Sequence, residues 1–130
     1  MKKKTSIGAW AYIWGGYAEK PTPLTTVVER LSALGFDGIE FAAFPPHLEP
    51  NTKEKRKEIK KLFDDHGLAV SGMAAPFPSP ATTPKDQYLE AVKGNLEICA
   101  DLNIPKLRVD TISPPTEIPG STHGRTTSSA

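Results

Sequence analysis

The chain has 130 residues, of which 38% are hydrophobic and 24% charged, and its 16 basic side chains nearly balance its 15 acidic ones. This composition excludes a wholly disordered chain, and a net charge of +1 offers little attraction for nucleic acid or anionic membranes. A single soluble globular domain is expected.

The low cysteine content and the absence of a long apolar segment predict the cellular compartment. Cys99 is the single cysteine, so the chain cannot form an internal disulfide. No stretch approaches the roughly 20 apolar residues of a membrane span. The basic residues 2–4 are not followed by an uninterrupted signal segment, because Gly8, Gly15 and Gly16 interrupt it. These features predict a cytoplasmic protein with no membrane or nucleic-acid partner.

The first two predicted strands flank a helix. Residues 5–14 are predicted to form a buried strand in which the aromatic residues alternate with small and aliphatic ones. A helix follows, capped by Thr22 with Pro23 as its first residue, and Gly35 ends it. Its apolar stripe has helical spacing and comprises Leu24, Val27, Val28, Leu31 and Leu34. Residues 36–42 are predicted to form the second strand.

The same order of elements then recurs. Asn51 and Glu54 have capping-box spacing ahead of a helix over residues 52–66, which ends at Gly67 and buries Ile59, Leu62 and Phe63. Residues 68–75 form the third predicted strand. A third helix opens at Thr83 and Pro84 and closes at Asn103, and its stripe comprises Tyr88, Leu89, Val92, Leu96 and Cys99. Residues 106–111 form the fourth strand.

The order βαβαβαβ predicts an α/β fold with a parallel sheet over residues 1–116, followed by a polar, disordered tail over residues 117–130. Alternation favours half of an eight-stranded (β/α)8 barrel over an open sheet, because one face carries charges. The helix-facing side chains would be Ile7, Ile39, Phe41, Leu107 and Val109. Those facing the barrel interior would be Trp10, Tyr12, Trp14, Glu40, Ser71, Met73, Arg108 and Asp110.

Several runs resemble the xylose isomerase-like TIM barrel family of sugar phosphate isomerases and epimerases. The resemblance spans about residues 5–112 and is carried by residues 7–10, 31–41, 62–72 and 95–104, most specifically by the Gly-Ile-Glu at 38–40. It implies a full (β/α)8 barrel with a divalent metal (Mn, Mg, Co or Zn). The family's ligands come chiefly from later strands, so no metal ligand can be assigned here and this chain alone is expected to bind none.

Six residues are candidates for binding a sugar or sugar phosphate, and no catalytic residue can be assigned. Trp10 and Trp14 offer aromatic surface to a sugar ring, although core packing is the alternative, above all for Trp10. Glu40 can accept hydrogen bonds from hydroxyls or instead pair with Arg108. Arg108 and Asp110 can grip a phosphate and a hydroxyl or form an ion-pair network. His47 lies in a loop, with or without a role in proton transfer.

Two functional hypotheses follow. The first is an isomerase or epimerase whose full-length parent moves a proton or hydride next to a sugar carbonyl, this truncated chain being inactive alone. The second is a non-catalytic half-barrel whose open edge strands bind a second copy or a partner. The sequence leaves open which sugar and metal are involved, whether the sugar is phosphorylated, and whether the chain is complete. A DNA endonuclease, a third branch, has little support because the chain is nearly neutral.

Overall fold

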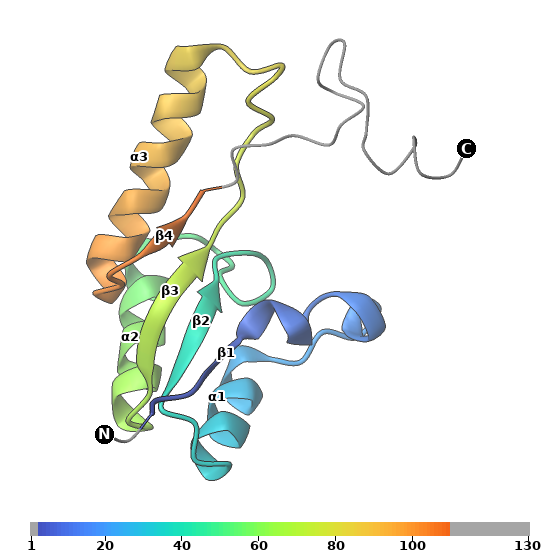
Figure 1. Cartoon of the computed structure of the whole chain (residues 1–130), viewed down its shortest axis with the longest axis vertical. Coiled ribbons are helices and arrows are strands. Elements are labelled where there is room, and N and C mark those ends of the chain that lie inside the picture. Colours follow the sequence, from blue (N-terminus) through green and yellow to red (C-terminus); the bar gives the residue numbers. More distant parts are fainter. Residues whose placement is uncertain (1–2, 110–130) are drawn as a thin grey trace.

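A computed structural model of the chain describes residues 3–109, and the predicted tail and Asp110 lie outside that range (Figure 1). Four parallel strands form one sheet in the order β1 (Ser6–Gly8), β2 (Gly38–Ala42), β3 (Ala69–Ala74) and β4 (Leu107–Arg108). They alternate with α1 (Leu24–Ala33), α2 (Lys53–Asp65) and α3 (Lys85–Leu102). This arrangement is the predicted α/β half-barrel of four strands and three helices. No helix within residues 3–109 has the length and apolar character needed to cross a bilayer.

The hydrophobic core lies between the sheet and the helices. Ile39 and Phe41 of β2 are fully buried, and the Phe41 ring meets that of Phe63 on α2 edge-on, with centroids 5.8 Å apart. The α1 residues Val27, Val28 and Leu31 complete this packing. These burials confirm the predicted stripes of the first two helices except at Leu34, which is exposed. Both helices end as expected, with Gly35 and Gly67 at positive φ angles of 82° and 64°.

The first strand is much shorter than predicted. It ends at Gly8, and the following residues form two short 3₁₀ helices, η1 (Ala9–Tyr12) and η2 (Gly15–Tyr17). Its pairing with β2 stops at Gly8 and Glu40, although β2 itself continues to Ala42. Beyond Gly8 the buried positions, Ala9 and Ile13, are four residues apart, which is helical rather than strand spacing. Tyr12 packs against the core instead of facing a barrel interior.

A bulge in β3 overturns the predicted orientation of Met73. Ile39 pairs with Val70, but the next residue, Glu40, pairs with Gly72, so Ser71 is an extra residue. Met73 therefore lies in register with Phe41 on the helix-facing side, where it is 1% exposed. Strand periodicity cannot reveal such a shift, because the bulge exists only in the pairing of two strands.

The ends and exposed faces of the helices also differ from expectation. Pro23, not Thr22, is the N-cap of α1, Pro84 is that of α3, and Leu34 is 72% exposed beyond the last turn of α1. On α3, Leu89 and Leu96 are exposed, whereas the buried side chains are Asn95, Ile98, Cys99 and Leu102. The Asn95 amide donates to the Pro76 carbonyl at 2.9 Å, and this contact turns a different face of α3 inward. Val109, predicted to face the helices, is 40% exposed just beyond β4.

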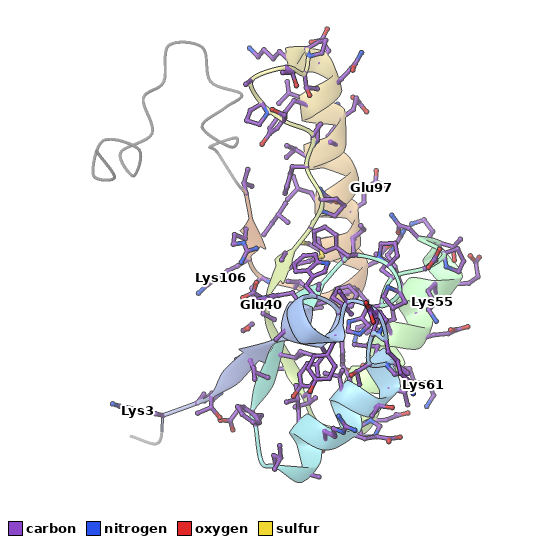
Figure 2. All side chains as sticks on the ribbon, turned by 90° about the vertical axis from the view of Figure 1, so that its right-hand side faces the viewer. Lys3, Glu40, Lys55, Lys61, Glu97 and Lys106 are labelled. Atoms are coloured by element: carbon purple, nitrogen blue, oxygen red, sulfur yellow. The ribbon has the colours of Figure 1, made fainter. Side chains whose placement is uncertain are left out.

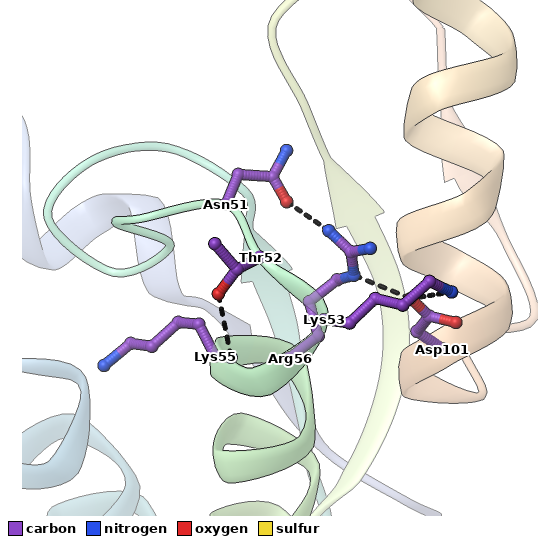
Figure 3. Close-up of polar contacts among 6 residues, drawn as sticks. All are labelled: Asn51, Thr52, Lys53, Lys55, Arg56 and Asp101. Atoms are coloured by element: carbon purple, nitrogen blue, oxygen red, sulfur yellow. Dashed lines mark hydrogen bonds and ion pairs between the residues drawn. The ribbon is translucent and has the colours of Figure 1, made fainter.

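Arg56 joins α2 to α3 (Figure 3). Its Nε donates to Asp101 Oδ2 at 2.7 Å and its Nη1 to Asn51 Oδ1 at 2.5 Å, while Lys53 lies 3.8 Å from the same carboxylate. The hydrogen bond from Arg56 lowers the pKa of Asp101 below its usual value. The cap of α2 is Thr52, whose Oγ1 accepts from the Lys55 amide. The predicted capping box is therefore wrong, because Asn51 binds Arg56 instead.

Candidate functional site

Glu40 lies in the centre of the sheet face that the helices leave uncovered. In register beside it are Gly8 of β1 and Gly72 of β3, neither of which carries a side chain. Arg108 Nη1 on β4 donates to Glu40 Oε1 at 3.4 Å, and the two side chains are 52% and 30% exposed. Figure 2 shows Glu40 on one side of the sheet and Lys55 and Lys61 of α2 on the other. The structure thus brings two predicted site residues together across three strands.

Trp10 lies on the same face, directly over Gly8. A Cβ placed on Gly8 would stand 2.2 Å from Trp10 Nε1 and 2.8 Å from Cδ1 and Cε2. The indole is still 39% exposed. Because Gly8 is the register partner of Glu40, the indole lies over the strand next to Glu40 and on the same face of the sheet.

Trp14 lies beyond the carboxyl end of β2. Its ring meets that of Phe44 edge-on at a centroid distance of 4.8 Å, and it remains 42% exposed. In parallel α/β folds the carboxyl ends of the strands carry the ligand-binding loops. Trp14 is therefore placed to contact a ligand that lies over the end of β2.

A shallow hollow of about 220 Å³ adjoins the Glu40–Arg108 pair, and it is lined by Ser71, Gly72 and Lys106 as well as by the pair itself. Ser71 Oγ lies 2.8 Å from Ser6 Oγ and donates to the Ile39 carbonyl at 3.3 Å. The hollow is lined by one carboxylate, two cations and one hydroxyl, which suit a small polyhydroxylated ligand because they provide both donors and acceptors.

His47 does not belong to this group of residues. It is 2% exposed, and its Nε2 donates to the Thr22 carbonyl at 2.8 Å, tying the loop after β2 to the segment before α1. It lines an open cavity of about 770 Å³ between α1 and α2, together with Pro21, Pro46 and Ile59. Its Nδ1 is buried and has no hydrogen-bond partner among residues 3–109. The contacts that the structure gives His47 are those of a loop anchor on the helix side.

The pH dependence of stability should report this burial. Desolvation lowers the pKa of His47, and the hydrogen bond to Thr22 opposes the shift. The unfolded chain binds a proton below its ordinary pKa of about 6.5, whereas the folded chain resists it, so the free energy of unfolding should fall as the pH decreases below that value. Urea unfolding between about pH 8 and 5 is the measurement. His47→Gln should reduce the dependence of the free energy of unfolding on pH. The control His66→Gln should leave the His47 contribution to that dependence in place. Equal pH dependence in wild type and His47→Gln would contradict the prediction.

Sequence reasoning missed the glycines that shape this face. Gly8 and Gly72 lie within predicted strands, where glycine is unfavourable and often marks a bulge or a close approach, so their position was an available signal. Asp110, the sixth candidate, lies outside the described residues. Within residues 3–109 no group of three or more His, Cys, Asp or Glu side chains could hold a metal ion, so the residues described do not by themselves fit the expected divalent metal.

Comparison with known proteins decides the family. Residues 28–129 match the family described as "Xylose isomerase-like TIM barrel". The chain belongs to this family. The half-barrel architecture agrees with that membership, and the resemblance seen in the sequence is confirmed. No curated protein is significantly similar in sequence.

Three solved structures are similar to this chain in fold. A 3-keto-D-glucoside 4-epimerase from E. coli is 17% identical, with a TM-score of 0.59, and the match covers 96% of this chain and 44% of the epimerase chain. A sugar phosphate isomerase/epimerase from Parabacteroides distasonis is 18% identical, with a TM-score of 0.55, and the match covers 90% of this chain and 43% of that protein's chain. A xylose isomerase domain protein from Alicyclobacillus acidocaldarius is 12% identical, with a TM-score of 0.55, and the match covers 80% of this chain and 35% of that protein's chain. The chain thus spans less than half the length of each.

Proposed function

We propose that this chain is the sugar-binding half of a sugar or sugar phosphate isomerase or epimerase. The observation that carries the proposal is the Glu40–Arg108 pair on the open face of the sheet, with the exposed Trp10 indole seated beside it. Family membership supports the fold, and the names of two solved relatives point to the reaction class. The reaction of the full-length parent would be a shift of a proton or hydride next to the sugar carbonyl, in the cytoplasm.

The residues described have binding roles in this proposal. The Glu40 carboxylate accepts hydrogen bonds from sugar hydroxyls while it accepts one from Arg108, since a carboxylate has room for several donors. The C–H face of the sugar packs on Trp10 and its far end on Trp14. Lys106, which lines the hollow, adds positive charge that favours a phosphate or another anionic substituent.

The divalent metal of the family would polarise the sugar carbonyl. Its ligands are proposed to come from strands of the barrel beyond the four described, because each solved relative is more than twice as long as the segment matched. This chain alone is therefore expected to bind sugar without turning it over.

Sugar binding is testable through the two tryptophans. Addition of D-fructose, D-tagatose or D-fructose 6-phosphate should change the tryptophan fluorescence of the wild-type chain in a saturable way. Glu40→Gln should weaken that binding roughly tenfold, because it replaces a charged acceptor by a neutral one. Glu97→Gln, the same chemical change on an exposed turn of α3, serves as control and should bind like wild type (Figure 2). Absence of saturable binding, or equal affinities in the two variants, would count against the proposal.

The second candidate, a non-catalytic half-barrel that associates with another copy, is favoured by the apolar side chains beside both sheet edges. Within residues 3–109, β1 and β4 each pair on one side only. Trp10, Trp14 and Tyr17 are exposed after β1, and Leu89, Leu96 and Val109 are exposed on α3 and after β4. Light scattering on the same samples separates the candidates, because a molar mass that doubles with concentration supports association and a constant monomer mass opposes it.

A further inference from the structure

The backbone at Gly8 does not require glycine. Its φ of −77° and ψ of 122° are ordinary extended values that any residue adopts. Glycine in a strand is usually unfavourable, because it packs no side chain and loses more conformational entropy on folding. A glycine at this position therefore needs a reason other than its backbone conformation.

That reason is the space taken by Trp10. The ideal Cβ position on Gly8 is within 2.2 Å of the indole Nε1 and 2.8 Å of two ring carbons, all well inside van der Waals contact. Any larger residue at this position would push the ring off the strand. The indole can therefore take this place over β1 only because residue 8 has no side chain.

Gly8 and the Trp10 indole lie on the side of the sheet that carries the proposed site. Ile7 packs against the core, so the next residue, Gly8, faces the opposite side of the sheet, and it is in register with Glu40. The indole thus lies over the strand next to Glu40 and on the same face, and it remains 39% exposed. The register partner of Glu40 on β3, Gly72, likewise carries no side chain. A ligand resting on the indole meets Glu40 at its edge.

We propose that Gly8 is a positioning residue that seats Trp10 beside Glu40, and that this seat determines how tightly the site holds the apolar face of a sugar. The functional part rests on the sugar-binding role proposed above, whereas the seating itself does not. A methyl group at residue 8 would displace the indole from Glu40 without touching the carboxylate.

The seating is tested in a Trp14→Phe background, where Trp10 is the single tryptophan. Adding Gly8→Ala should shift the Trp10 emission to longer wavelength and increase its quenching by acrylamide, because the ring moves into water. Gly94→Ala is the matched control, since nothing lies within 4 Å of the Cβ position of this helical glycine. It should leave the emission unchanged. An unchanged emission in Gly8→Ala would overturn the seating.

A stability cycle keeps the seating testable if Gly8→Ala folds poorly. In a Trp10→Ala background the obstructing ring is gone, so adding Gly8→Ala should leave the urea midpoint unchanged or raise it. A fall in the midpoint as large as that in wild type would show that residue 8 clashes with something else and would overturn the proposal.

Sugar affinity tests the functional part. Gly8→Ala should weaken the fluorescence-detected binding of the sugar that wild type binds best by roughly tenfold, in line with the loss of one stacking contact, while Gly94→Ala binds normally. Equal affinity in Gly8→Ala and wild type would overturn the role in binding even if the ring moves. Failure of wild type to bind any of the sugars would instead refute the proposed function, and the emission shift would still decide the seating.

Discussion

Replacing Phe41 with alanine is expected to lower the free energy of unfolding by about 3–5 kcal/mol, the largest effect of any single substitution considered. Phe41 is fully buried in the middle of β2 and meets Phe63 of α2 edge-on at 5.8 Å. The substitution removes buried apolar area and leaves a cavity at the junction of sheet and helices, which rigid strands cannot close. Urea unfolding followed by circular dichroism measures the change.

Leu34→Ala provides the matched comparison for Phe41→Ala. Leu34 belongs to the predicted stripe of α1, but it is 72% exposed and follows the last helical residue, Ala33. Its replacement should change the free energy of unfolding by no more than about 0.5 kcal/mol. Similar losses in the two variants would mean that the core does not lie where the structure places it.

Replacing Met73 with alanine is expected to cost about 2–5 kcal/mol, the usual range for a buried methionine. The expectation depends on the bulge at Ser71, because simple alternation along β3 would put Met73 on the open face of the sheet, where its removal would cost little. In the structure it is 1% exposed and in register with Phe41. The same urea experiment applies.

Ser71→Ala is the partner experiment for the bulge. Ser71 is exposed, and its hydroxyl contacts Ser6 and the Ile39 carbonyl. Losing these solvent-accessible contacts should cost about 1 kcal/mol, clearly less than Met73→Ala. If instead Ser71→Ala were the more damaging variant, the strand would run without the bulge and the predicted orientation of Met73 would be correct.

Part of the site was accessible from sequence, because strand alternation needs only local information. Glu40 and Arg108 were expected on one face from the charges that recur at every second position, and the structure joins them at 3.4 Å. For His47, which follows a strand, the sequence leaves open a role in a site or a plain loop position, and in the structure its Nε2 donates to the Thr22 carbonyl. A loop side chain can satisfy its hydrogen bonds in several directions, and local sequence does not choose among them.

Local sequence patterns already predict the order of elements, the parallel half-barrel and, apart from Leu34, the core stripes of the first two helices. These follow from hydrophobic periodicity and from helix stops such as Gly35 and Gly67, which act within a few residues of chain. The end of β1, the direction of Met73, the buried face of α3 and the resting place of the Trp10 indole follow from tertiary contacts. The first three depend on partners distant along the chain: the pairing of β1 with β2, the bulged pairing of β2 with β3, and the Asn95–Pro76 contact. The fourth depends on how the chain turns into η1 after Gly8.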